Sequence, residues 1–192
     1  LRHGATTRVA PGSILGQRID PELSESGRQQ AVDVTTRISG LPHRISAIYH
    51  SSLRRARQTA HIVAEQLGKE SLSEPDFTEM DFGDYDGRRM IEQGETFRQW
   101  KTNPASLQFP DGESLQEVQT RMMNRLDLLA EAHPGETVLV VGHVFALISV
   151  LCRVHGVLLD DFRQFHLEHC AVNLVERGPN GWRGMPAPPT EA

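Results

Sequence analysis

The chain has 192 residues, of which 38% are hydrophobic and 23% charged, a balance typical of one globular domain with its own core. It carries 20 lysines and arginines against 25 acidic residues, for a net charge of −5. This charge argues against a nucleic-acid partner or an acidic membrane surface, because such binders normally carry a basic excess.

Capping and periodicity signals divide the chain into alternating helices and strands. Ser24 and Ser114 are good N-caps, and apolar residues at spacings of three and four follow each of them. The run 137–141 is apolar and β-branched, which is typical of a central parallel strand buried on both faces. The predicted elements are a loop over 5–23, a helix from Ser24 to about Leu41, a strand over 45–49, a helix over 53–67, an irregular acidic stretch over 69–89, a short helix over 89–101, a long helix from Ser114 to Pro134, a strand over 137–141, a buried helix over 144–155 and a last strand over 171–176.

This alternation predicts an α/β fold with a mostly parallel central sheet. No repeat or composition shift marks a second domain, so we expect residues 1–184 to form one domain and 185–192 a disordered tail. The segment 84–112 is a candidate lid. Its Phe97 and Trp100 fit equally well an ordinary surface helix held by two aromatic anchors.

The cysteines and the absence of targeting signals indicate a cytoplasmic protein. Cys152 and Cys170 are too few for a disulfide framework and are expected to be small reduced core residues. No apolar run reaches the roughly 18 residues that span a bilayer, and the opening residues lack a secretory pattern. Because the sequence does not begin with Met, we expect a few native residues before Leu1.

Three segments with histidines and arginines fall at the ends of predicted strands. They are Leu1–Gly4, His50–Arg55 and Gly142–His143. Ligands of open α/β sheets bind outside the carboxyl ends of the strands, so these segments are expected to converge there. The planar fork of arginine suits phosphate oxygens, and histidine can act as a nucleophile or proton carrier. The residues by themselves therefore suggest a phosphate site, although His3 and His143 could also be ordinary strand-end residues.

Six blocks in order, spread over most of the chain, resemble the histidine phosphatase superfamily, also called the phosphoglycerate mutase-like family. The R-H-G block alone would be a weak signal, whereas the six ordered blocks together are specific. The blocks are Arg2-His3-Gly4 (family pattern R-H-G), residues 20–31 (D-x-P-L-[ST]-x-x-G-x-x-Q-A), residues 51–60 (S-x-L-x-R-A-x-x-T-A), residues 79–87 (E-x-x-x-G-x-x-[ED]-G), residues 110–114 (G-G-E-S) and residues 140–143 (V-x-[SG]-H). The resemblance implies a three-layer sandwich of the phosphoglycerate mutase type.

The resemblance also implies a mechanism. His3 would attack phosphorus through a neutral ring nitrogen and form a phosphohistidine, with Glu79 as general acid and then base. Arg2, Arg55 and His143 would contact the phosphoryl oxygens, where transition-state charge accumulates. No metal or other cofactor is expected, because these fixed groups already supply the charge.

Departures from the family pattern bear on the substrate more than on the reaction. Ala5 replaces the glutamate that serves some members as an acid, which places more weight on Glu79. Thr6 keeps the usual hydroxyl and is expected to touch phosphate. Val9 replaces a common asparagine, so one phosphate contact is expected to be lost or to be supplied by Arg8 or Arg18. Val144 replaces a common glycine and still offers a backbone N–H.

Other polar residues in these segments have ordinary explanations. Asp81 is the rival of Glu79 for the role of acid. Arg54 and Arg57 are expected to form a solvated helix face, and Glu113 to belong to a helix start. His166 and His169 have the i,i+3 spacing of a metal pair on a helix, but no third ligand follows and a structural role is expected.

The function expected is a metal-independent phosphomonoesterase acting on a small phosphorylated metabolite, as a monomer or homodimer. The first alternative is a cofactor-dependent phosphoglycerate mutase, which needs a closed pocket and typically a longer chain. The second is a phosphate-binding pseudoenzyme, which would be expected to have lost one of the four residues Arg2, His3, Arg55 and His143.

Overall fold

The computed structural model describes residues 1–7, 9–10 and 12–185. Its centre is a parallel sheet in the order β2-β1-β3, formed by Leu72–Ser73, Ile45–His50 and Thr137–Val141. Residues 1–3 extend the sheet beyond β3, where Arg2 forms a parallel bridge with Gly142. The segment that carries His3 therefore lies beside the end of β3, next to Gly142.

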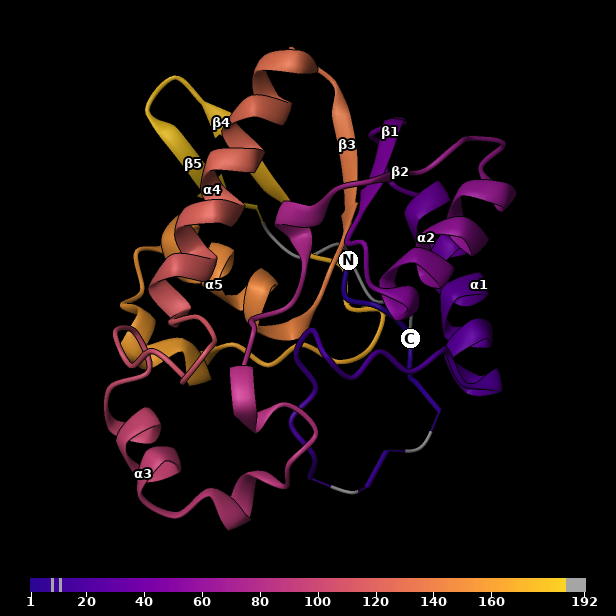
Figure 1. The fold of residues 1–192 in the computed structure, drawn as a ribbon. Coiled ribbons are helices and arrows are strands. Elements are labelled where there is room, and N and C mark those ends of the chain that lie inside the picture. Colours follow the sequence, from indigo (N-terminus) through magenta and orange to yellow (C-terminus); the bar gives the residue numbers. More distant parts are fainter. Residues whose placement is uncertain (8, 11, 186–192) are drawn as a thin grey trace.

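Helices cover both faces of the sheet, which gives the three layers visible in Figure 1. The helices α1 (Glu25–Ser39) and α2 (Arg54–Gln66) pack on one face against Leu139 and Val141. The helices α4 (Leu115–Ala132) and α5 (Val144–His155) pack on the other face, where Val138 and Val140 contact the larger core. This alternation of side chains along β3 explains why its sequence is apolar throughout, and the α/β prediction is confirmed.

The candidate lid segment is held by aromatic packing. It contains two 3₁₀ turns (Gly83–Tyr85 and Met90–Gln93) and α3 (Gly94–Thr102). Trp100 is 3% exposed and lies against Phe145 and Phe162, with ring centroids 5.5 and 5.4 Å away. The aromatic anchor is therefore present, and the role as a lid stays a prediction. The predicted helix start at 89 is wrong, because the chain first forms the turn that ends at Gln93.

The end of the chain differs from the prediction. Residues 171–174 form no strand, and an antiparallel hairpin of β4 (Val175–Gly178) and β5 (Gly181–Gly184) follows them. The apolar run over 171–174 resembles a strand, but these residues pass Arg2 with a single backbone bond, from Arg2 N–H to the Ala171 carbonyl at 3.1 Å. Regular pairing begins only where β5 supplies a partner. Of the predicted tail, residues 186–192 lie outside the described part of the chain.

Two glycines allow the loop after His3 to lie on the start of α1. A Cβ at Gly4 would come within 2.4 Å of the Gly27 carbonyl oxygen, and one at Gly27 within 1.9 Å of the Ala5 carbonyl oxygen. Both approaches exclude any side chain. The glycines of the first two blocks therefore bring the nucleophile-bearing segment and α1 together.

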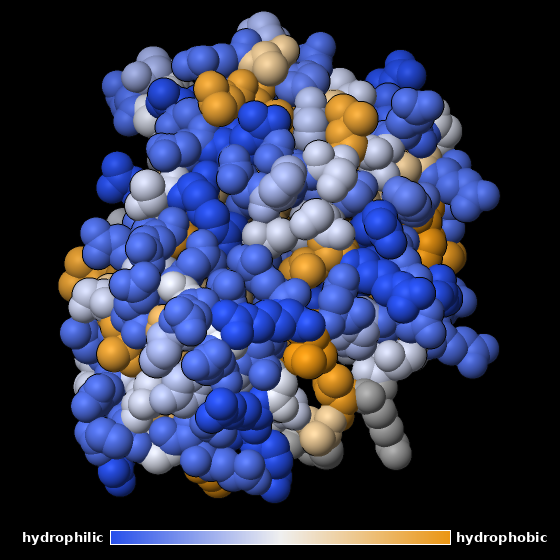
Figure 2. Space-filling view, in the orientation of Figure 1, coloured by the Kyte–Doolittle hydropathy of each residue, from blue (hydrophilic) through white to orange (hydrophobic). Residues whose placement is uncertain are grey.

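On the face drawn in Figure 2, apolar side chains are scattered among hydrophilic ones. Across the described ranges, no helix combines the length and the apolar character needed to cross a bilayer.

The capping box at the start of α4 gives a first quantitative prediction. The Ser114 hydroxyl accepts the Glu117 N–H at 3.3 Å, and the Glu117 carboxylate accepts the Ser114 N–H at 2.8 Å. Replacing Ser114 by alanine is expected to lower the free energy of unfolding by about 1 kcal/mol, since one helix-end N–H loses its partner. Urea denaturation measures this, and Ser114→Thr, which keeps the hydroxyl, is the control. Equal stability of the alanine variant and wild type would show that the cap does not contribute to the free energy of unfolding.

Candidate active site

The ring of His3 is placed as a neutral nucleophile requires. Its backbone N–H donates to the Gly142 carbonyl at 3.0 Å, which ties the residue to the end of β3. Ring Nδ1 lies 2.8 Å from the carbonyl oxygen of Gly4 and can only donate to it, so Nδ1 carries the proton and Nε2 the lone pair. Burial, followed by the charge of Arg55, holds the pKa of His3 well below its ordinary value. The ring is therefore neutral at physiological pH.

His143 stands beside His3 at the start of α5. The two ring centroids are 5.1 Å apart, and His143 is fully buried as the N-cap residue of the helix. Burial and then the charge of Arg55 hold its pKa well below the ordinary value as well. The predicted convergence of the first and third segments is thus present in the structure.

Two arginines flank the histidine pair. Arg55 comes from the first turn of α2 and is 1% exposed. Its terminal nitrogens donate to the Gly16 carbonyl at 2.8 Å and to the Asp20 carboxylate at 3.2 Å. Arg2 donates to the Leu167 carbonyl and lies 3.2 Å from ring Nε2 of His169. Both guanidinium groups are therefore oriented by the protein before any ligand arrives.

Three nitrogens around His3 have no hydrogen-bond partner. Within the part of the chain that the structure describes, Nε of Arg2, Nε of Arg55 and Nδ1 of His143 are buried and unpaired. Buried polar groups in folded proteins are almost always paired, so unpaired groups call for an explanation. The charges of both arginines reach both histidine rings. The arrangement suits an anion with several oxygen acceptors, such as a phosphoryl group.

Glu79 is the buried carboxyl of the site. It is 2% exposed, and its Oε1 accepts backbone N–H groups of Met80, Phe145 and Ala146 at 2.9, 3.1 and 3.1 Å. Burial raises the pKa of Glu79, while these N–H groups and the charge of Arg55 oppose the rise. The rival Asp81 turns away, because its Oδ1 accepts the Gly83 N–H at 2.8 Å and faces Arg18.

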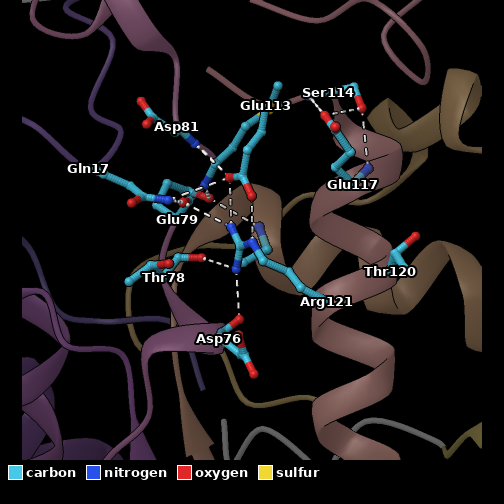
Figure 3. Close-up of polar contacts among 12 residues, drawn as sticks. Gln17, Asp76, Thr78, Glu79, Asp81, Glu113, Ser114, Glu117, Thr120 and Arg121 are labelled. Carbon is cyan, nitrogen blue, oxygen red and sulfur yellow. Dashed lines mark hydrogen bonds and ion pairs between the residues drawn. The ribbon is translucent and has the colours of Figure 1, made fainter. Parts of the chain in front are cut away.

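An arginine–glutamate pair holds the segment that carries Glu79 (Figure 3). Arg121 of α4 donates to the carbonyls of Thr78 and Glu79 at 2.9 and 3.1 Å. It also pairs with Glu113 at 2.7 Å, and Glu113 accepts the Asp81 N–H at 2.9 Å. Gln17 adds a bond to the Glu79 carbonyl at 2.8 Å. Glu113 is thus more than part of a helix start. It holds the Asp81 N–H directly, and it holds the Glu79 carbonyl through Arg121.

The remaining predicted contacts are Thr6, Val144, Arg18 and Arg8. Thr6 pairs with Leu23 through the backbone, and Val144 begins α5 directly after His143. Arg18 is engaged by Asp84 at 3.3 Å and by the Asp111 carbonyl at 2.9 Å. Their roles as substrate contacts stay predictions. Arg8 lies outside the described residues, and Arg54 and Arg57 are exposed, as predicted.

Three residues that contact the predicted site residues were not assigned to the site from the sequence. Ser51 Oγ lies 2.7 Å from His143 Nε2, Asp20 holds Arg55, and the ring of His169 lies 5.6 Å from that of His3. Burial and then the charge of Arg2 lower the pKa of His169 to about 4, so it accepts from Arg2 as a neutral ring. Ser51 and Asp20 belong to the family blocks, which was the available signal. His169 had none, and its segment is not helical.

A metal centre is not evident in the described parts of the chain. No group of three or more His, Cys, Asp or Glu side chains there is arranged to hold an ion. His166 is exposed and pairs with Glu168 at 2.6 Å, away from the contacts that His169 makes.

Known proteins similar to this chain carry phosphatase and mutase names. The sequence profile of the histidine phosphatase superfamily (branch 1) matches residues 1–185. Probable phosphoglycerate mutase GpmB of Cronobacter sakazakii is 31% identical over 186 residues, which cover 95% of this chain and 85% of that protein. Phosphoserine phosphatase 1 of Hydrogenobacter thermophilus is 31% identical over 179 residues, covering 91% and 83%. The structure of Bacillus stearothermophilus YhfR matches with a TM-score of 0.85 at 26% identity, covering 95% of this chain and 92% of that one.

The chain belongs to the histidine phosphatase superfamily. The predicted fold of the phosphoglycerate mutase type is confirmed by the structural match. The predicted class, a phosphoric monoester hydrolase, is confirmed by family membership together with relatives named as phosphatases.

Proposed function

We propose that the protein is a metal-independent phosphomonoesterase that hydrolyses a small phosphorylated metabolite through a phosphohistidine on His3. The observation that carries the proposal is the set of three unpaired buried nitrogens, on Arg2, Arg55 and His143, beside a neutral His3. They would donate to phosphoryl oxygens and stabilise the charge of the transition state.

The reaction proceeds in two displacements. Nε2 of His3 attacks phosphorus, the bond to the leaving oxygen breaks, and Glu79 gives its proton to that oxygen. Glu79, now a carboxylate, accepts a proton from water, whose oxygen attacks phosphorus and breaks the bond to His3. Inorganic phosphate leaves, and His3 and protonated Glu79 are restored. Thr6 and the backbone N–H of Val144 are proposed as further phosphate contacts, with Arg8 and Arg18 as candidates farther along the substrate.

The mutase alternative differs in the fate of the phosphoryl group, which returns to the substrate instead of passing to water. Chain length does not separate the two activities, because the match to the relative named as a probable phosphoglycerate mutase covers 85% of that protein. A relative named as a phosphoserine phosphatase makes phosphoserine a rational first substrate. The proposed location is the cytoplasm, which is supported by two free, buried cysteines.

A substrate panel with and without a chelator tests the proposal. Purified protein is incubated with phosphoserine, 3-phosphoglycerate and p-nitrophenyl phosphate, with and without EDTA, and released phosphate is measured. We expect phosphate release that EDTA does not change. Strong inhibition by EDTA would contradict the metal-free mechanism. Isomerisation of 3-phosphoglycerate without phosphate release would favour the mutase, and phosphate binding without turnover the pseudoenzyme.

A further inference from the structure

The two ring nitrogens of His143 have different surroundings. Nε2 lies 2.7 Å from Oγ of Ser51, whereas Nδ1 is buried and unpaired among the described residues. Both side chains are fully buried, so water does not decide which nitrogen is protonated. That choice matters to the reaction, because only an N–H on Nδ1 can donate to a phosphoryl oxygen.

The hydrogen bonds of Ser51 favour one answer. Its Oγ already accepts the backbone N–H of Leu53 at 3.1 Å. The hydroxyl proton then has one acceptor within reach in the described structure, Nε2 of His143. If Nε2 carried the proton instead, the hydroxyl proton of Ser51 would be buried without an acceptor. Nδ1, the ring nitrogen that has no protein partner, would then be a bare lone pair, which repels phosphoryl oxygens.

We propose that Ser51 is a positioning residue that fixes the tautomer of His143, donating its hydroxyl proton to Nε2 so that Nδ1 presents an N–H to the phosphoryl group. The inference rests on the proposed function for the role of that N–H. Ser51 lies in the turn between β1 and α2, four positions before Arg55. One short segment thus supplies both Arg55, a cationic phosphate contact, and Ser51, which sets the protonation of the second contact, His143.

Among the described residues, Ser51 is the polar side chain that bonds to the ring of His143. Burial, followed by the charge of Arg55, holds the pKa of His143 well below its usual range, so the ring is neutral and carries one proton. His143 caps α5 without a side-chain hydrogen bond to the helix, so the helix does not hold either nitrogen. Without the hydroxyl, neither tautomer would have a polar partner among the residues that the structure describes.

The tautomer can be read directly by nitrogen NMR of protein labelled with ¹⁵N-histidine, with His143→Asn identifying the signals. In the free wild type we expect an N–H at Nδ1 and a bare Nε2, and in Ser51→Ala a mixture of both tautomers. Ser51→Thr, which keeps the hydroxyl, should restore the wild-type pattern. Ser149→Ala is the matched control, because Ser149 is an equally buried serine whose hydroxyl donates within α5, to the Ala146 carbonyl at 2.7 Å.

Kinetics supply the second measurement. Ser51→Ala should lower kcat about tenfold with KM nearly unchanged, which is less than the loss expected on removing a transition-state donor outright. A proton on Nε2 in the free wild type would overturn the proposal, and so would a Ser51→Ala variant with an unchanged tautomer and the kcat of Ser149→Ala. The expected tautomer in a protein that hydrolyses no phosphomonoester would instead refute the proposed function and leave the assignment of the proton intact.

Discussion

Replacing His3 by alanine is expected to reduce kcat for phosphomonoesters by about 10⁴–10⁶-fold, because the covalent route is lost with the nucleophile. The structure explains why the loss of kcat should lie near the upper end of this range. The ring is neutral, and its Nδ1 is committed to the Gly4 carbonyl at 2.8 Å, which leaves the lone pair of Nε2 for attack. The neighbouring ring of His143 is not equivalent, because its Nε2 lies 2.7 Å from the Ser51 hydroxyl. Mass spectrometry after a rapid quench should find phosphate on His3 in wild type and no phosphoenzyme in the variant.

A matched control separates loss of chemistry from loss of structure. His133 bonds to the Tyr49 hydroxyl at 3.0 Å, at the far end of α4 from the site, so His133→Ala removes a histidine with structural contacts only. It should keep its activity. Hydrolysis by His3→Ala at the parent rate would show that the nucleophile is another group, while binding of inorganic phosphate by His3→Ala would show that the oxyanion contacts survive.

Glu79→Gln should lower kcat for phosphoserine by about 10²–10⁴-fold, the usual range for loss of a general acid. Glutamine keeps the shape of the side chain, and its amide oxygen can still accept the N–H groups at the start of α5. With p-nitrophenyl phosphate, whose leaving group needs no proton, the first step should survive. We therefore expect a burst of one p-nitrophenol per enzyme, followed by slow turnover, because the variant has no carboxylate to accept a proton from the attacking water.

The same variant tests the direction of the pKa shift. Burial raises the pKa of Glu79, so the acid form persists to higher pH than in an ordinary glutamate, and kcat for phosphoserine should fall as pH rises through that pKa. A raised pKa in the folded state also means that this group's contribution to stability is present at low pH and lost as pH rises. Urea denaturation should thus show wild type losing stability relative to Glu79→Gln with rising pH.

Asp81→Asn provides the comparison. Asp81 lies two residues away, but its carboxylate caps Gly83 and faces Arg18. This variant should keep the activity toward phosphoserine. If Asp81→Asn lost turnover and Glu79→Gln kept it, the assignment of the acid would have to be reversed.

The order of the elements and the main site residues could be read from the sequence because their signals are local. Ser24 and Ser114 cap the helices that they predict, and the apolar run at 137–141 forms the buried strand β3. The histidine and arginine segments follow strand ends, and parallel strands bring those ends to one edge of the sheet. The ordered blocks then added the identity of Glu79, which no local signal marks as a functional carboxyl.

The contacts that prepare the site were decided only by the tertiary structure. The Ser51–His143 bond joins residues 92 apart in the sequence, the Arg2–His169 contact joins residues 167 apart, and the bond from Arg121 to the Glu79 carbonyl spans 42 residues. Periodicity reports which face of an element is buried, but it does not say which polar group that face meets. The sequence by itself determined the fold class and the reacting groups. The fold decided which nitrogens are protonated, which stay unpaired and how the carboxyl is held, because these properties depend on partners supplied by distant segments.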